Sequence, residues 1–490
     1  MDLELCYLPA HEALSRFRDR SLSPVELTVA VIARAEAVSD SVNPFADRYF
    51  DEALAAARRA EARYARPGAR TRRLEGIPLA VKDSFTIRGR RSTVGSLFNA
   101  NAVGERTDPC VERLLRAGAV LFARTTCPEF CWLFACHSRM WGVTRNPWRA
   151  DVTPGGSSGG SAAALAAGAA TLALGSDSTG SIRQPAAQCG IVGYQGPYGR
   201  FPIAGRASFD PYVNAGPMTR TIRDAALMTN VMAGPHPLDH NSLPRKLTIA
   251  SDRHDIAGLR IACSFDLGHY EIVDDVRRET AAAMQALHDA GAVVEEVEIG
   301  WASDAIRLAH LHEEFLFVDL IESALAEHPE LVCDYTPELA ETARSATADD
   351  FRAAIRTAGI VWRDHFGPLM QRFDAFVCPT VASPEVPAEN WQQHRLNVNA
   401  RELTDTDLAM TALFNMFDRC PVLAIPSGMT GDGLPTGLQI VGRPYDDPTV
   451  FRIGRALEIG RPWLDVPGRR PPAATRGLSD PQAPDRQERH

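Results

Sequence analysis

The chain has 490 residues, 45% of them hydrophobic and 23% charged, and its formal net charge is −9. This composition is ordinary for a globular protein with a large buried core, and it excludes disorder over most of the length. The 52 basic and 61 acidic residues are mixed along the chain, so no basic stripe indicates nucleic acid or an anionic membrane surface as a partner.

The N-terminus and the cysteines bear on cellular location. The chain begins with an acidic segment, 1–5, and not with a charged region followed by an apolar one, so we expect no secretory signal. Its ten cysteines are scattered, which favours reduced thiols and a cytoplasmic enzyme. The longest apolar run, 162–174, is too short to cross a bilayer, and we predict that it forms a buried helix.

The densest group of potential metal ligands comprises Cys127, Cys131, Cys136 and His137. It lacks the paired short spacings of structural zinc sites, and aromatic residues lie between the cysteines. We therefore predict a buried apolar segment at 127–136, with neither a metal nor any other cofactor.

Helical and strand patterns alternate in the first half. The region 23–64 predicts two solvent-facing helices, the first capped by Ser23. A short apolar run at 76–83 predicts a buried strand, and Lys82 stands abruptly at its end. A helix followed by a strand is predicted at 111–125. This alternation favours an α/β fold.

The second half repeats the pattern more loosely. Strands are expected at 259–263 and 293–299, with a helix at 273–290 between them, and two further strands, 375–380 and 422–426, are each expected to stop at a proline. A helix-rich insertion is expected at about 301–369. We predict one domain over 1–465 and a disordered tail over 466–490, because the tail has almost no large apolar residue to bury.

Two loops rich in glycine and serine are the most informative motifs. The first, 154–161, precedes an alanine-rich run, and the second covers 175–183. Glycines let backbone N–H groups approach a ligand, and a helix starting after the first loop would direct its N-terminal donors at negative charge. The loops therefore predict a site for an anion or a developing negative charge, with serines as candidate nucleophiles.

Each loop alone is open to other interpretations. A phosphate-binding loop is disfavoured, because no lysine followed by serine or threonine completes it. A nucleophile elbow would use Ser157, with His310 or His312 as base, but the preceding residues 151–154 do not form an apolar strand. Structural serines in ordinary turns are the remaining alternative.

Further segments join these loops into a recognisable order. They are 76–78 with 81–83, 142 with 146–148, 154–161, 175–183, 193 with 198–200, 216–218, 379–380, and 433–435 with 437–439. In these segments, over about residues 10–460, the chain resembles the amidase signature family. The resemblance implies an α/β/α sandwich, in which helices cover both faces of a large, mixed, twisted sheet.

The resemblance also implies roles for individual residues. Ser181 attacks the substrate carbonyl, Ser157 bridges it to a base, and Lys82 is that base. Family members hold the bridging serine through a cis peptide bond, here between Gly156 and Ser157. Cys131 falls where the family places a residue that lines the acyl pocket, although a packed core thiol is an equal alternative.

The oxyanion hole implied by the resemblance consists of backbone N–H groups of Ser178, Thr179 and Gly180, together with that of Ser181. Ser158 is expected to support this loop. Asp177 and Arg183 flank it, and we expect them to fix it through an ion pair, ordinary surface charges being the alternative.

The residues make this chemistry plausible on their own. An exposed lysine is protonated at neutral pH, whereas burial at the end of an apolar strand disfavours the charged form and makes Lys82 a candidate base. The Ser157 hydroxyl can accept a proton from Ser181 while it donates its own to the amine, and the relay can then run in reverse toward the leaving group.

Two positions depart from the family pattern. Thr179 precedes Gly180 where the family has a second glycine, which bears on substrate range. Gln195 stands where a lysine often follows the apolar run 191–193. We expect catalysis to survive both changes.

Three functions compete. The leading hypothesis is an amidohydrolase that cleaves a small-molecule carboxamide through an acyl-Ser181 intermediate, with carbamates and esters as further candidate substrates. The alternative is the glutaminase subunit of a transamidation complex, which the apolar segment 130–134 disfavours because a glutamine side chain requires polar partners. A catalytically silent binding protein is disfavoured because Lys82 and both serines are retained. The sequence leaves the acyl group open, and a homodimer is one candidate assembly.

Overall fold

The computed structural model describes residues 2–301, 304–389, 396–399, 401–404, 407–463 and 469–472. At its centre lies an 11-stranded sheet in the order β1-β3-β2-β6-β8-β7-β14-β15-β11-β9-β10. Its strands are β1 (Phe45–Arg48), β2 (Pro78–Lys82), β3 (Val120–Thr125), β6 (Leu172–Asp177), β7 (Val192–Gln195), β8 (Asn214–Thr219), β9 (Arg260–Cys263), β10 (Val293–Glu296), β11 (Ala375–Pro379), β14 (Val422–Met429) and β15 (Pro435–Gly442). Two small hairpins pair β4 (His137–Ser138) with β5 (Gly142–Val143), and β12 (Leu396–Val398) with β13 (Arg401–Leu403).

The sheet is mixed. Strand β2 runs parallel to both β3 and β6, and β9 runs parallel to β10 and β11. Between these two parallel blocks, β8, β7, β14 and β15 pair in antiparallel fashion. The predicted α/β class with a large mixed sheet is confirmed.

Helices flank this sheet in two rows. Helices α6 and α7 contact each other and the central strands, while α5, α8, α15 and α9 follow one another in contact along the sheet. The helices are α1 (Leu3–Tyr7), α2 (Ala10–Asp19), α3 (Pro24–Val42), α4 (Phe50–Ala65), α5 (Pro109–Arg116), α6 (Gly159–Ala166), α7 (Arg183–Cys189), α8 (Ile222–Met232), α9 (Asp274–Asp289), α10 (Asp304–Glu327), α11 (Thr336–Ser345), α12 (Ala348–Val361), α13 (Gly367–Arg372), α14 (Ala412–Asn415) and α15 (Asp447–Gly460). Within the described ranges, no helix is both long and apolar enough to span a bilayer.

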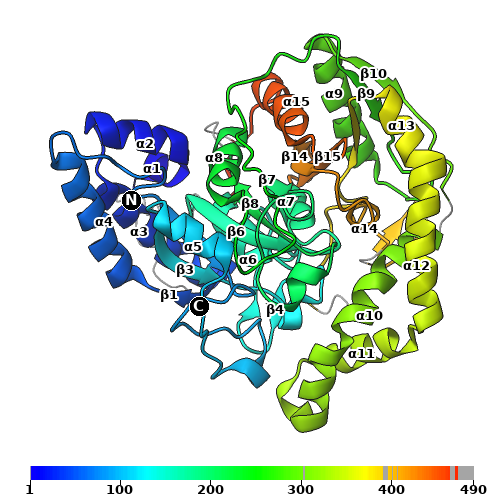
Figure 1. The fold of residues 1–490 in the computed structure, drawn as a ribbon, viewed down its shortest axis with the longest axis horizontal. Coiled ribbons are helices and arrows are strands. Elements are labelled where there is room, and N and C mark those ends of the chain that lie inside the picture. Colours follow the sequence, from blue (N-terminus) through cyan, green and yellow to red (C-terminus); the bar gives the residue numbers. More distant parts are fainter. Residues whose placement is uncertain are drawn as a thin grey trace, which may run out of the picture.

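The two ends of the molecule are helical. Figure 1 shows α1–α4, in blue, at one end and α10–α12, in yellow-green and yellow, at the other. The predicted insertion corresponds to α10–α13, which contributes to a second hydrophobic core around Trp301 and Phe366. The assignment of 1–465 to one domain stays a prediction.

The N-terminal prediction needs two corrections. The expected capping box is present, because the Ser23 hydroxyl and the Glu26 carboxylate each accept a backbone N–H at the start of α3. However, α3 is not solvent-facing: Leu27, Val31 and Val38 are buried in the main core. Strand β1 also separates α3 from α4, and a strand of only four residues gave no clear periodic signal.

The predicted buried helix over 162–174 is wrong in its extent. Helix α6 ends at Ala166, and β6 begins at Leu172. Gly168, with φ +73°, reverses the chain between them. Continuous burial hid the boundary, since a fully apolar helix and a fully apolar strand have the same hydrophobic pattern.

A predicted strand end differs in detail, and the predicted tail is described only in part. Strand β11 ends at Pro379 as expected, but β14 continues past Pro426 to Met429, with a register shift at that point which accommodates the missing N–H. Within the predicted tail the structure describes residues 469–472, where the Arg470 guanidinium pairs with Glu4, and the disorder of the tail stays a prediction. The rest of the predicted tail, 466–468 and 473–490, lies outside the described residues.

Candidate active site

Two parallel neighbouring strands bring the candidate residues together. Lys82 is the last residue of β2, and Asp177 is the last residue of β6. Because β2 and β6 run parallel, their carboxyl ends meet at the same edge of the sheet. The first glycine and serine loop also reaches this edge, immediately before α6.

Lys82 is completely buried, with 0% exposure. Its Nζ donates hydrogen bonds to Ser157 Oγ at 2.7 Å and to Ser176 Oγ at 2.9 Å. The peptide bond between Gly156 and Ser157 is cis. The structure therefore joins the predicted lysine and the first predicted serine directly.

The second predicted serine lies close to the first. The Ser158 N–H donates to the Ser181 carbonyl oxygen at 3.1 Å, which ties the two loops together. The Ser158 hydroxyl in turn donates to the carbonyl oxygen of Ser176 at 3.1 Å. Ser157 and Ser181 line the same pocket, although their hydroxyls share no hydrogen bond within the part of the chain that the structure describes. Catalytic hydrogen bonds often form only once substrate is bound.

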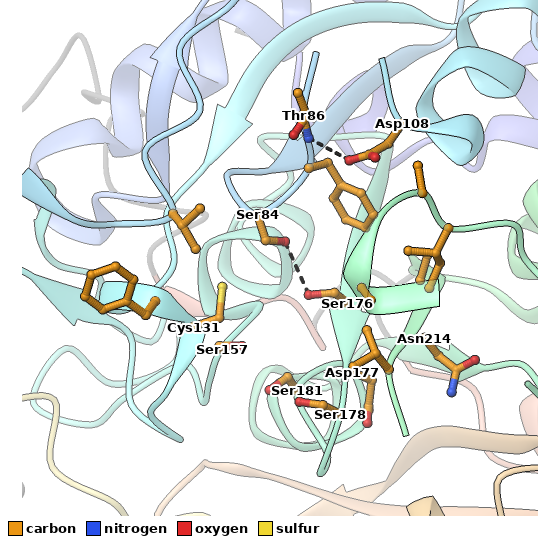
Figure 2. Close-up of a pocket in the computed structure, with 18 of the residues that line it drawn as sticks. Ser84, Thr86, Asp108, Cys131, Ser157, Ser176, Asp177, Ser178, Ser181 and Asn214 are labelled. Carbon is orange, nitrogen blue, oxygen red and sulfur yellow. Dashed lines mark hydrogen bonds between the residues drawn. The ribbon is translucent and has the colours of Figure 1, made fainter. Parts of the chain in front are cut away.

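The pocket has a volume of about 300 Å³, within the usual range for a small-molecule site. Figure 2 shows serines from three segments converging on it. Its lining is otherwise largely apolar. The residues are Ser84, Phe85, Thr86, Val94, Asp108, Phe130, Cys131, Trp132, Ser157, Ser176, Asp177, Ser178, Ser181, Ile203, Ala204, Ala207, Val213, Asn214 and Ala215.

The predicted ion pair between Asp177 and Arg183 is present and fully buried, with Arg183 Nη2 at 3.0 Å from Asp177 Oδ1. Asp177 also accepts the backbone N–H groups of Gly180 and Ile182, at 2.9 and 3.0 Å. Burial alone would raise the pKa of Asp177, but the Arg183 charge and these hydrogen bonds lower it. One carboxylate thus holds the loop that carries Ser181.

A distant segment completes this network. The Thr411 hydroxyl donates to the Thr179 carbonyl oxygen at 2.6 Å, and Arg183 Nη1 donates to the Thr411 carbonyl oxygen at 2.9 Å. Gly180 has φ +138°, and a Cβ there would lie 2.0 Å from Thr411 Oγ1. No other residue type fits at position 180 without displacing Thr411.

Cys131 lines the pocket, at the end of a short 3₁₀ turn, Glu129–Cys131. Its φ of +61° is unusual for a residue other than glycine. A hydrogen bond with the Cys127 thiol lowers the pKa of Cys131 and outweighs the opposing effect of burial. Neighbouring Cys136 instead donates to Thr126 Oγ1 at 3.7 Å. Over the described residues, no group of His, Cys, Asp or Glu is arranged to hold a metal ion.

The nucleophile elbow hypothesis does not fit the geometry. His312 Nε2 lies 3.1 Å from Asp210 Oδ1, and the ring stacks on Tyr212. His310 packs edge-on against Phe134, and burial lowers its pKa to about 4. Neither histidine lines the pocket, where Ser157 meets Lys82.

Several site residues had not been identified from the sequence. Ser176 was part of a quoted motif, but nothing in the motif indicated that its hydroxyl accepts from Lys82. Thr411 and Asn415 come from a segment more than 220 positions from the loop that they contact, so no local pattern could have found them. Asp108 precedes a proline at the start of α5 and has the sequence signature of an ordinary helix cap.

Comparison with known proteins identifies the family. A family model described as Amidase matches residues 26–451. The chain belongs to the Amidase family. It is 33% identical over 473 residues to an acylamidase of Rhodococcus erythropolis, covering 94% of this chain and 97% of that protein. It is also 32% identical to the glutamyl-tRNA(Gln) amidotransferase A subunit of Chloroflexus aggregans, covering 94% of this chain and 98% of that protein.

Solved structures agree with this assignment. A bacterial aryl acylamidase of the amidase signature family superimposes on this amidase with a TM-score of 0.85 and 26% identity, covering 93% of this chain and 96% of that one. The resemblance stated from the sequence motifs is therefore confirmed. So is the predicted enzyme class, a hydrolase that acts on amide C–N bonds.

Proposed function

We propose that this amidase cleaves a small-molecule carboxamide through an acyl-enzyme intermediate on Ser181. The Ser181 oxygen attacks the amide carbonyl carbon, the C–N bond then breaks, and the amine leaves. Water subsequently attacks the acyl ester, releasing the carboxylic acid and restoring the Ser181 hydroxyl.

Ser157 and Lys82 move the protons in this mechanism. As Ser181 attacks, its proton passes to Ser157, and the Ser157 proton passes to the Lys82 amine. The relay runs in reverse to protonate the leaving amine. The observation that carries this proposal is the 2.7 Å hydrogen bond between the buried Lys82 Nζ and Ser157 Oγ, at the wall of a pocket that Ser181 also lines.

The negative charge that develops on the substrate oxygen requires fixed donors. We assign this role to backbone N–H groups of the loop formed by Ser178, Thr179, Gly180 and Ser181. A single donor of this kind can contribute roughly 3 kcal/mol to transition-state stabilisation. In this structure the Gly180 N–H donates to the Asp177 carboxylate at 2.9 Å, so this group fixes the loop and would have to be released from Asp177 to act as an oxyanion donor.

The pocket favours an acyl group with an apolar body. Rings and aliphatic side chains, among them Phe85, Phe130, Trp132 and Ile203, dominate its wall. This favours amides similar in kind to those of acylamidases over free glutamine, because the carboxylate of glutamine would need a cationic partner and none of the described residues that line the pocket carries a guanidinium or ammonium group. The similarity to amidotransferase A subunits keeps a glutaminase role as the alternative. A cytoplasmic location and a homodimer stay predictions.

A panel of substrates tests the proposal. The pure protein is incubated, without partner proteins, with aryl and alkyl amides, carbamates, esters and glutamine, and the release of acid and amine is followed. The expected result is turnover of apolar amides by the wild type and none by Ser181→Ala. Turnover of glutamine alone, or activity only after other proteins are added, would instead support the amidotransferase role.

A further inference from the structure

One charged group in the pocket has no role in the mechanism above. Among the residues that line the pocket, Asp108 and Asp177 carry carboxylates. The Asp177 carboxylate is occupied by Arg183, Asn415 and backbone N–H groups. Asp108 is therefore the carboxylate available to a ligand.

The Asp108 side chain does not cap the helix that it precedes. Asp108 precedes the first turn of α5 but makes no capping hydrogen bond to that helix. Its Oδ2 instead accepts the Thr86 N–H at 2.6 Å, and Asp108 is one of the residues that line the pocket. Within the described residues, no side chain forms a salt bridge with it. Oδ1 therefore retains the capacity to accept a hydrogen bond from a ligand.

Asp108 and the reacting groups lie in different parts of the pocket lining. Figure 2 draws it at the end opposite Ser178 and Ser181. The pocket wall contains aromatic side chains, including Phe85, Phe130 and Trp132. A ligand that reached Asp108 from Ser181 would thus combine an apolar body with a polar or charged distal end.

We infer that Asp108 binds a protonated amine at the distal end of the substrate's acyl group, so that the preferred substrates are carboxamides whose acyl chain or ring carries an ammonium group. This inference rests on the proposed function. A carboxylate matches an ammonium by charge and by hydrogen bonding, and aromatic faces add attraction for a cation. A neutral hydroxyl would satisfy the hydrogen bond but not the charge.

The titration of Asp108 gives the binding a pH dependence. Burial raises the pKa of Asp108 to about 6, although the Thr86 N–H and the Arg124 charge act in the opposite direction. Arg124, which faces Asp108 from β3, is itself paired with Asp83. Asp108 is thus ionised at neutral pH and becomes neutral as the pH falls through about 6, where it ceases to attract a cation.

Matched substrates test the inference. Anilides of ω-amino acids of increasing chain length are compared with anilides in which a methyl group replaces the ammonium. The quantity compared is kcat/KM for the ammonium substrate divided by kcat/KM for the methyl substrate of the same length. We expect this ratio to be highest at one chain length and to fall at least about tenfold in Asp108→Asn. Glu105→Gln, which removes an exposed carboxylate outside the pocket, is the matched control and should keep the wild-type ratio.

Binding provides a measurement that does not depend on turnover. Calorimetry with Ser181→Ala should show that an alkylamine binds more tightly than the alcohol of equal length, and that this difference disappears in Ser181→Ala/Asp108→Asn and below about pH 6. Equal ratios in the wild type and Asp108→Asn, or equal binding of amine and alcohol, would overturn the inference. Failure of the proposed function is distinguishable, because Ser181→Ala would then keep its amide turnover.

Discussion

Replacing Asp177 by asparagine tests how the catalytic loop is held. The substitution keeps the size of the side chain but removes the charge that faces the fully buried Arg183. In Asp177, Oδ1 accepts hydrogen bonds from the Gly180 N–H and Arg183, and Oδ2 accepts from the Ile182 N–H and Arg183. In asparagine one of these two oxygens is replaced by an NH₂ group, which cannot accept those hydrogen bonds and therefore faces other donors. Removing one partner of a buried ion pair typically costs about 3–5 kcal/mol, and we expect Asp177→Asn to lie in this range.

Equilibrium unfolding in urea measures this cost as a loss in the free energy of unfolding. The control is Glu322→Gln on the exposed pair with Arg344, which should leave that free energy nearly unchanged. Because the pKa of Asp177 is lowered in the folded protein, its stabilisation is present above the ordinary value of 3.8 and is lost as the pH falls through the folded-state pKa. Asp177→Asn should lack this acid-dependent loss. A cost below about 1 kcal/mol would refute the assignment of a structural role to the pair.

We also expect measurable effects at three other positions. Ser176→Ala removes one of the two hydroxyl acceptors of Lys82 Nζ, so kcat should fall by roughly five- to tenfold with little change in KM in steady-state assays. The pKa of Cys131 is lowered, so this thiol should react with iodoacetamide at about pH 7 before the other described cysteines. Peptide mass spectrometry measures the labelling, and equal labelling of another described cysteine would contradict the prediction. Burial alone would lower the pKa of His11, but the hydrogen bond and the charge of Asp224 outweigh burial, and the pKa is raised. The His11–Asp224 pair therefore stabilises the folded protein at low pH, and this stabilisation is lost as the pH rises through the folded-state pKa of His11. His11→Gln should therefore cost more unfolding free energy near about pH 5.5 than near about pH 9, and a cost that does not vary with pH would contradict this.

The parts of the site that the sequence predicted share a feature: their signals are local. Lys82 stands at the end of an apolar strand, and the serine loops are compact motifs. Asp177 and Arg183 lie only six positions apart. The order of these segments also carried the family resemblance and hence the sheet architecture. Each of these predictions depended on neighbouring residues or on a recognised order, not on a calculation of tertiary contacts.

The parts that could not be predicted depend on tertiary contacts or on burial. Thr411 contacts the Thr179 carbonyl from 232 positions away, and no pattern in either segment indicates the pairing. The end of α6 at Ala166 was missed because all of 162–174 is buried, which removes the periodicity that marks a helix. Asp108 has a helix-cap sequence, yet its carboxylate binds Thr86, because tertiary packing overrides the local preference.

The identity of the acylated residue tests the central claim most directly. The protein is mixed briefly with a para-nitrophenyl ester, quenched in acid and digested, and the acylated peptide is located by mass spectrometry. The account predicts an acyl group on Ser181 in the wild type and no acylated peptide in Ser181→Ala. An acyl group on Ser157 or on the acidic Cys131 thiol, with Ser181 unmodified, would contradict it.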